Sequence, residues 1–145
     1  MIDNKGTTHT INDIQITGIY EKGTTTNTAF KYYGFVASNQ YYVNPQNTKV
    51  GGSISNMSIN QFVSDGYGFT VDNKASISKI IVGTSSNNKK ATVKYSFFAC
   101  YNAGDISSCS LYVKSINNNS NKKFIYYSDS TGTCTSCLLN NKAAN

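Results

Sequence analysis

The stretch ATVKYSFFACY, residues 91–101, alternates apolar and polar side chains over most of its length. Successive side chains of a β-strand point to opposite faces of the sheet, so this alternation predicts a strand with one buried face. The residues predicted to share that face are Val93, Tyr95, Phe97, Ala99 and Tyr101. We therefore interpret the stretch as a core strand of a β-rich domain.

The segment CSLYVKSI, residues 109–116, follows after a short loop and has a similar pattern. An antiparallel pairing of the two segments places Phe97 opposite Tyr112 and, in the same register, Cys100 opposite Cys109. A slip of one residue would destroy both matches. The two segments are therefore predicted to form a hairpin that a disulfide closes.

Similar runs recur along the 145 residues, separated by clusters of Gly, Asn, Ser and Asp, as is typical of all-β domains. The predicted strands cover residues 11–20, 29–38, 41–44, 68–71, 76–83, 91–101, 109–116 and 123–128. We expect a single domain, residues 1–145, folded as an antiparallel β-sandwich of about seven to eight strands. Fraying is expected at residues 1–8 and 140–145.

One short helix is predicted over residues 58–66. Ser58 and Gln61 have the spacing of a capping box, and Gly66 suits the left-handed residue that ends a helix. The overlapping segment SISNMSI, residues 53–59, can also be read as a strand, so both interpretations stay open for this region.

The chain has few charged residues, and most of them are basic. All thirteen basic residues are lysines, and the formal net charge is +6. A protein without arginine lacks the planar group that most often reads guanine edges and clamps phosphates, so nucleic acid is not an expected partner. No apolar run approaches the roughly 18 residues that span a bilayer, and the N-terminus lacks the apolar region of a signal peptide.

The four cysteines are predicted to form disulfides, Cys100 with Cys109 and Cys134 with Cys137, although a crossed pairing stays open. Zinc is the weaker alternative, because zinc sites use two closely spaced cysteine pairs and eight residues separate Cys100 from Cys109. Redox catalysis by Cys134-x-x-Cys137 is weaker still, since no helical pattern follows the motif. Disulfides would place the protein outside the cell or on its surface.

The sequence contains no pattern of an active site, so we expect neither an enzyme nor a bound cofactor or metal. The sole histidine, His9, is flanked by threonines, and most of the acids have the neighbours of turn residues. Tyrosine is the stronger signal, because in each doublet within a strand one ring should face outward. The candidate ligand-binding residues are Tyr33, Tyr41, Tyr67 and Tyr127.

Together these features predict a non-catalytic extracytoplasmic interaction module. A surface, adhesion or filament (pilus-like) subunit that works by protein contact or self-association is the first hypothesis. The alternative is a carbohydrate-binding module in which outward tyrosines stack on sugar rings. A small secreted hydrolase comes third, because two converging carboxylates are not evident in the sequence.

Overall fold

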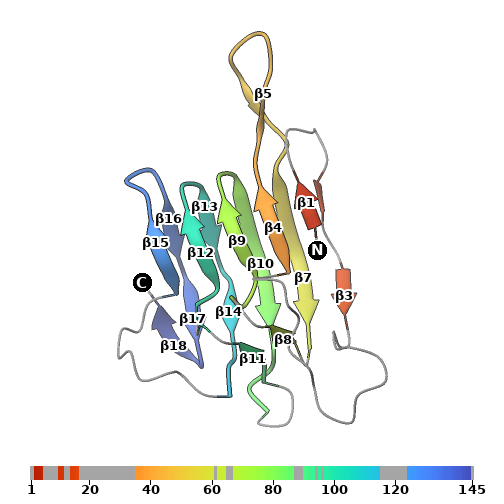
Figure 1. Ribbon diagram of the computed structural model, residues 1–145, viewed down its shortest axis with the longest axis vertical. Coiled ribbons are helices and arrows are strands. Elements are labelled where there is room, and N and C mark those ends of the chain that lie inside the picture. Colours follow the sequence, from red (N-terminus) through yellow and green to blue (C-terminus); the bar gives the residue numbers. More distant parts are fainter. Residues whose placement is uncertain are drawn as a thin grey trace.

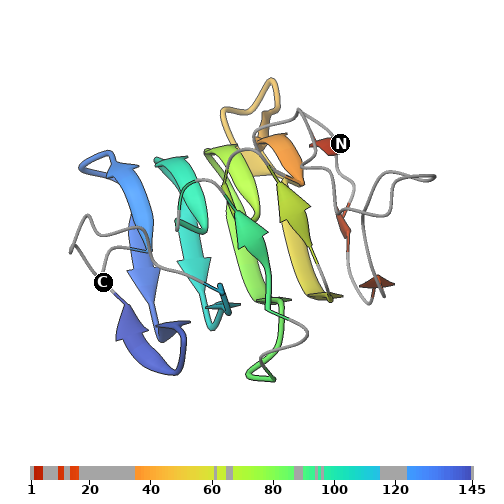
Figure 2. The same ribbon diagram turned by 60° about the horizontal axis from the view of Figure 1, so that its bottom comes forward.

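The computed structural model describes residues 2–4, 10–11, 14–16, 35–60, 62–64, 67–86, 90–93, 95, 97–114 and 124–144. Within these residues every regular element is a β-strand, and most neighbouring strands pair in parallel. The chain winds so that each full turn, here called a coil, stacks on the previous one, which makes a parallel β-solenoid (Figures 1 and 2).

Sheet A takes one strand from each coil. Its order is β1 (Ile2–Asn4), β4 (Val36–Asn39), β9 (Thr70–Asn73), β12 (Ala99–Asn102) and β15 (Ile125–Ser128), and all its pairs are parallel. We number the coils one to five by these strands. Because the order in the sheet is the order in the sequence, each strand contacts the strands one coil away (Figure 1).

Sheet B forms a second face of the solenoid. It contains β2 (Thr10–Ile11), β3 (Ile14–Ile16), β7 (Ser53–Ile59), β10 (Ser76–Val82), β13 (Asp105–Ser107), β14 (Ser110–Leu111), β16 (Thr133–Thr135), β17 (Cys137–Leu139) and β18 (Lys142–Ala144). A short parallel ladder joins β8 (Val63–Ser64) to β11 (Thr92–Val93), and an antiparallel hairpin joins β5 (Tyr42–Val43) to β6 (Lys49–Val50).

Sheet B is bent at one position that recurs in four coils. Asn56, Lys79, Ser108 and Ser136 have φ values of 53°, 55°, 52° and 53°. Such left-handed values are uncommon outside glycine. The strand pairings on either side place these residues at equivalent positions of successive coils. The bends therefore stack into a continuous corner of the solenoid.

The core consists of columns of similar side chains, since in-register parallel stacking places equivalent residues one above the other. The phenylalanine column is Phe35, Phe69, Phe98 and Phe124. The ring centroids of Phe98 and Phe124 lie 4.6 Å apart, and those of Phe69 and Phe98 lie 5.1 Å apart. An aliphatic column contains Ile59, Val82, Leu111 and Leu139, all buried.

A column of buried asparagines lies at the ends of three strands of sheet A, β4, β9 and β12. Asn39 donates through Nδ2 to Oδ1 of Asn73 at 2.9 Å, and Asn73 donates in the same way to Asn102 at 2.7 Å. Asn102 in turn donates to the backbone oxygen of Thr133 at 3.0 Å. All three asparagines have an exposed fraction of 0%. The column is stable in an apolar core because its amides satisfy one another.

A C-terminal strand covers one side of the last coil. Strand β18 pairs antiparallel with β17 and so covers that edge of sheet B, and its last residue, Ala144, is buried. Residues 142–144 thus form a strand in the segment where we expected fraying. Within the described residues, sheet A ends at β15 with its outer edge uncovered.

The predicted antiparallel sandwich is wrong. Residues 91–101 divide between β11 and β12, which belong to different ladders, and β12 pairs in parallel with β9 and β15. Residues 109–116 are not its partner, because β14 lies in sheet B. Alternation of apolar and polar residues identifies a strand but does not encode its direction of pairing, which is why the sequence pattern misled us.

The predicted helix and disulfides are also corrected. The described part of the chain contains no helix, and residues 53–59 form β7, the alternative interpretation of that segment. The thiols of Cys100, Cys109, Cys134 and Cys137 are all free. Cys100 lies in β12 of sheet A, whereas Cys109 follows the corner of sheet B, so the two cannot face each other across a hairpin.

Candidate functional site: a groove beside an inserted hairpin

Among the described connections between sheets A and B, that of the second coil differs from the others. In the third and fourth coils this connection consists of residues 74–75 and 103–104. In the second coil it consists of residues 40–52 and contains the hairpin of β5 and β6. Figure 1 shows this hairpin projecting beyond the neighbouring connections. In solenoids, insertions into single repeats map to loops on one face, and that face is often the binding face.

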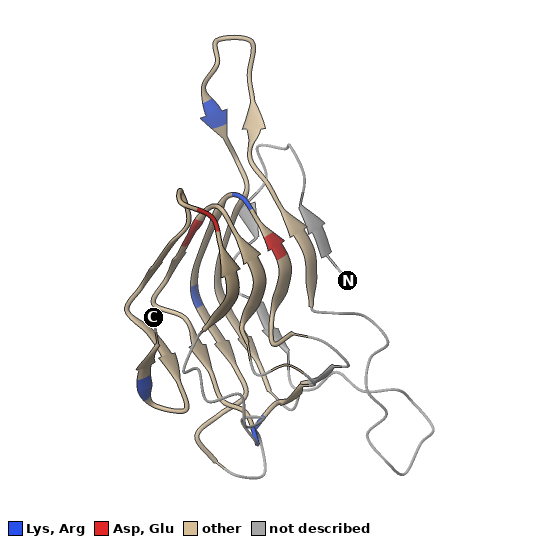
Figure 3. Ribbon diagram, turned by 60° about the vertical axis from the view of Figure 1, so that its left-hand side comes forward, with Lys and Arg blue, Asp and Glu red and all other residues tan. Residues whose placement is uncertain are grey.

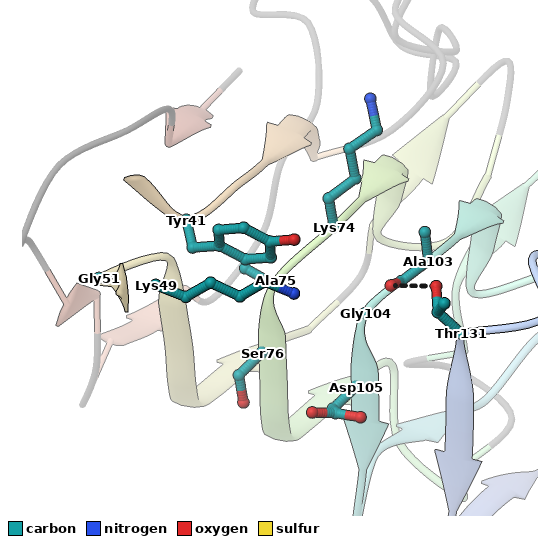
Figure 4. Close-up of a pocket in the computed structure, with 10 residues that line it drawn as sticks. All are labelled: Tyr41, Lys49, Gly51, Lys74, Ala75, Ser76, Ala103, Gly104, Asp105 and Thr131. Atoms are coloured by element: carbon teal, nitrogen blue, oxygen red, sulfur yellow. Dashed lines mark hydrogen bonds between the residues drawn. The ribbon is translucent and has the colours of Figure 1, made fainter. Parts of the chain in front are cut away.

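A groove of about 430 Å³ lies between this hairpin and the connections of the following coils. It is lined by Tyr41, Lys49, Gly51, Lys74, Ala75, Ser76, Ala103, Gly104, Asp105 and Thr131 (Figure 4). The volume falls in the range of small-ligand sites, and the lining combines an aromatic ring, charged groups, hydroxyls and exposed backbone. The groove is therefore the best candidate site in the described part of the chain.

Tyr41 and Lys49 form the hairpin wall of the groove. The Lys49 Nζ atom lies 4.2 Å from the centroid of the Tyr41 ring, a cation–π contact. Figure 4 shows the two side chains lying along each other, with the Tyr41 hydroxyl directed across the groove. Among the described residues, Lys49 forms no ion pair with a carboxylate. Figure 3 shows the hairpin's basic position standing apart from the acidic positions.

The opposite wall offers hydrogen-bonding groups. Asp105 accepts a hydrogen bond through Oδ1 from the Thr133 hydroxyl at 2.7 Å. The Thr131 hydroxyl donates to the backbone oxygen of Ala103 at 3.1 Å, the dashed line in Figure 4. Lys74 lies at the end of the groove, and its Nζ is 3.3 Å from Oδ2 of Asp72. This wall therefore presents a carboxylate and hydroxyls, with its lysine already paired.

The floor of the groove depends on a glycine. A Cβ atom at Gly104 would lie 2.1 Å from the backbone oxygen of Ala75, one coil away. Only glycine allows this close approach, so the connections of the third and fourth coils are packed tightly together. Their backbone atoms consequently form a shallow floor at the foot of the hairpin.

A turn in the last coil positions Thr131. The Asp129 carboxylate accepts hydrogen bonds from the backbone N–H of Thr131 at 3.2 Å and from the Tyr101 hydroxyl at 2.9 Å. The Thr131 N–H, followed by the Tyr101 hydroxyl, holds the pKa of the Asp129 carboxyl below its usual value. The same bond to Asp129 raises the pKa of Tyr101. An ionised Asp129 therefore stabilises this turn.

The structure does not bring the predicted tyrosines into one site. Tyr41 lines the groove. Tyr67 lies near Cys100 and packs against Tyr95 with ring centroids 5.2 Å apart, and burial raises its pKa. Tyr127 is stacked on Tyr101, and Tyr33 lies outside the described residues.

The ring geometry of Tyr127 bears on the sugar-binding hypothesis. The Tyr101 and Tyr127 rings are 5.6 Å apart with an interplanar angle of 16°, so they face each other along the solenoid. Sugar rings stack on exposed aromatic faces. Tyr101 therefore covers one face of the Tyr127 ring, whereas Tyr41 lines the groove, so Tyr41 is the better candidate for this site.

The cysteine motif belongs to the core. Cys134 pairs in register with Ile106, and Cys137 occupies the position equivalent to Cys109 of the preceding coil. Burial raises the pKa of the Cys109 thiol. In the described ranges, no three His, Cys, Asp or Glu side chains are arranged to hold a metal ion. The spacing of Cys134 and Cys137 thus follows the solenoid repeat.

The sequence analysis did not select four of the residues that line the groove, Lys49, Lys74, Asp105 and Thr131. An internal repeat in the sequence would have indicated the region where they lie. The segments FVASN, FTVDN, FACYN and FIYYS begin at Phe35, Phe69, Phe98 and Phe124. Each is followed by one of the similar segments ISNMSI, ISKIIV, ISSCSL and CTSCLL. Successive repeats are offset by 34, 29 and 26 residues, so no fixed period is visible. Aligning them exposes residues 40–52 as the insertion.

Comparison with protein-family models, curated proteins and solved structures finds no match for this chain. In the residues that the structure describes, no helix has the length and apolar character needed to cross a membrane.

Proposed function

We propose that this protein is a non-catalytic module that binds a glycan in the groove beside the hairpin. The observation that carries the proposal is the insertion at residues 40–52, which places the Tyr41 ring opposite the polar groups of Asp105 and Thr131. Glycan recognition uses this combination, because a sugar unit has an apolar ring face and a rim of hydroxyls.

The direction of the groove favours an oligosaccharide over a compact ligand. Its floor and far wall come from equivalent connections of successive coils, with Ala75 in the third, Gly104 in the fourth and Thr131 in the fifth. Neighbouring parallel strands lie about 4.8 Å apart, so these residues form a row along the solenoid axis. A linear chain laid along this row would contact several coils at once.

The proposal is limited to binding. Hydrolysis of a glycosidic bond needs two carboxylates placed on either side of it. Asp105 is the one carboxylate among the residues that line the groove, and Asp72 nearby is paired with Lys74. The lining therefore supports recognition of hydroxyls and gives no acid–base pair.

Titration calorimetry with a panel of neutral and acidic oligosaccharides tests the proposal. Tyr41→Ala should weaken binding of any ligand found by about tenfold or more, because it removes the aromatic wall. Tyr42→Ala is the matched control, since Tyr42 is the next residue, is 43% exposed and does not line the groove. Equal losses in both variants, or no binding across the panel, would contradict the proposal.

Protein contact is a second candidate function, and one observation favours it. Within the residues that the structure describes, strand β15 is an uncovered edge of sheet A, and its Tyr126 and Tyr127 are 60% and 59% exposed. Open strand edges pair readily with other chains. A surface or filament subunit that self-associates there should sediment faster as concentration rises. The predicted disulfides were the argument for an extracellular location, and the four free thiols remove it. An extracellular location is therefore proposed only as part of this second candidate function.

A further inference from the structure

We infer that the groove selects glycans that carry carboxylate groups and that Lys49 is the residue that recognises the acid. This inference rests on the proposed glycan binding and names the class of sugar. The two lysines of the groove differ in a way that assigns the role to Lys49.

Lys74 already forms an ion pair with a carboxylate of the same chain, that of Asp72. Its Nζ lies 3.3 Å from Oδ2 of Asp72, and Figure 4 shows its side chain extending away from Asp105 and Ser76. A ligand carboxylate at Lys74 would have to compete with the carboxylate of Asp72. Lys74 therefore adds little to the recognition of an anion.

Lys49 is placed differently. Its Nζ lies over the Tyr41 ring at 4.2 Å, and within the described chain it has no carboxylate partner. An ammonium group has three N–H donors, and the ring face uses one side of the group. The remaining donors are free for oxygen atoms of a ligand, while the ring holds the ammonium at the groove wall.

Asp105 defines how such a ligand would lie. It stands on the wall opposite the hairpin, and its Oδ1 atom is engaged by the Thr133 hydroxyl. A carboxylate on the ligand would be repelled near Asp105 and attracted near Lys49. Sugar hydroxyls, by contrast, can donate to Asp105. A uronic acid unit, with one carboxylate and several hydroxyls, satisfies both walls, whereas a densely sulfated chain would place anions beside Asp105.

The overall charge of the protein supports the same class of ligand. The formal net charge is +6, the groove carboxylate Asp105 is hydrogen-bonded to Thr133, and the nearby Asp72 is paired with Lys74. A net positive protein raises the local concentration of anionic ligands and their rate of association. This attraction is screened by salt, which supplies an independent measure of the contribution of charge.

The test compares uronic acid oligomers with their methyl esters, which have the same backbone and no charge. Oligomers of glucuronate, mannuronate and galacturonate are titrated into the full chain by calorimetry. At least one free acid should bind about tenfold or more tightly than its ester, because a charge-assisted hydrogen bond is lost in the ester. This preference should decrease as the salt concentration rises.

A lysine outside the groove provides the matched control. Lys49→Met retains the unbranched stem against Tyr41 but removes the charge, so it should abolish the preference for the acid, whereas Lys49→Arg should retain it. Lys142→Met should change the preference less than about threefold, since Lys142 lies in β18 and does not line the groove. Circular dichroism establishes that each variant is folded.

The outcomes separate this inference from the proposed function. Equal affinity for acid and ester, or a preference that survives Lys49→Met, would overturn the role of Lys49 while leaving glycan binding intact. Tighter binding of sulfated oligosaccharides than of any uronate would overturn the assignment to carboxylates. Binding of neutral oligosaccharides alone would do the same. Failure of every glycan to bind the folded protein would overturn both proposals.

Discussion

The side chain of Asn73 donates a hydrogen bond to Oδ1 of Asn102, 2.7 Å away and one coil further along the chain. Asn73 also accepts from Asn39 of the preceding coil, so it links three successive coils. Its Nδ2 atom also donates to the backbone oxygen of Ala75, and its Oδ1 atom accepts from the backbone N–H of Ala75, at the connection that forms the floor of the groove. This single buried residue thus joins the stacking of the solenoid to the geometry of the candidate site.

Asn73→Ala should lower the free energy of unfolding by about 2 kcal/mol or more, because it removes these bonds from a site where the asparagine is 0% exposed. Urea denaturation monitored by circular dichroism measures the change. Gln40→Ala is the comparison, since Gln40 is half-buried and its side chain makes one bond, to Ser38. A smaller effect of Asn73→Ala than of Gln40→Ala would contradict the structural role of the column.

Some of this fold was predictable from sequence and some was not. The alternating pattern correctly located β10, because half-buried strands have that pattern in any sheet, whereas the strand predicted at 68–71 overlaps β9 only in part. These patterns could not reveal that each strand pairs with the equivalent strand one coil away, since this pairing depends on how the chain winds between the strands. The buried asparagines were missed for another reason. Asn73 follows Asp72, a pair typical of turns, and only its stacking on Asn39 and Asn102 makes it a core residue.

The candidate site was predictable in one residue only. Tyr41 was selected as an outward tyrosine, and it lines the groove. Lys49 was not selected, because one lysine in a polar loop has no distinguishing pattern. Its position over the Tyr41 ring depends on the hairpin pairing of Val43 with Lys49. The candidate site therefore depends on an insertion that can be recognised only by comparison with the repeats around it.

The cysteines should behave as free thiols in the native protein. Intact mass should be unchanged by reductant, because all four are unpaired. Modification of the native protein by a thiol reagent should be fastest at the half-exposed Cys100 and slower at Cys134, because the neighbouring Cys137 thiol and burial raise the pKa of Cys134. Cys109 and Cys137 should stay unmodified, since they are 0% and 2% exposed. Full modification should require denaturant. A gain in mass on reduction, or rapid labelling of Cys109, would contradict this prediction.

The turn at Asp129 should make stability depend on pH. The folded-state pKa of Asp129 is lowered, so its contribution is present above the unfolded carboxyl pKa of about 3.9 and is lost as pH falls through the folded value. The pKa of Tyr101 is raised, so its contribution is lost only as pH rises through a value above about 10. The melting temperature of the wild type should therefore exceed that of Asp129→Ala between these limits.

Melting temperatures measured across the pH range check this expectation. The difference between wild type and Asp129→Ala should shrink at both acidic and strongly alkaline pH. Tyr101→Phe should remove the alkaline change and leave most of the acidic one, because the backbone N–H of Thr131 still bonds Asp129. A difference that stays constant with pH would mean that ionisation of Asp129 does not stabilise the turn.

Replacing the inserted hairpin tests whether the solenoid folds without the candidate site. The connections at residues 74–75 and 103–104 join the same two sheets directly, so residues 40–52 can be replaced by Ala-Gly, the sequence of residues 103–104. The solenoid should persist, because the core columns contain no residue of the hairpin, and the circular dichroism spectrum should retain its β-sheet form. Glycan binding should fall below detection, since Tyr41 and Lys49 are removed with their wall of the groove. Unfolding of the shortened chain would instead show that the hairpin supports the second coil, and undiminished binding would place the site elsewhere on the solenoid.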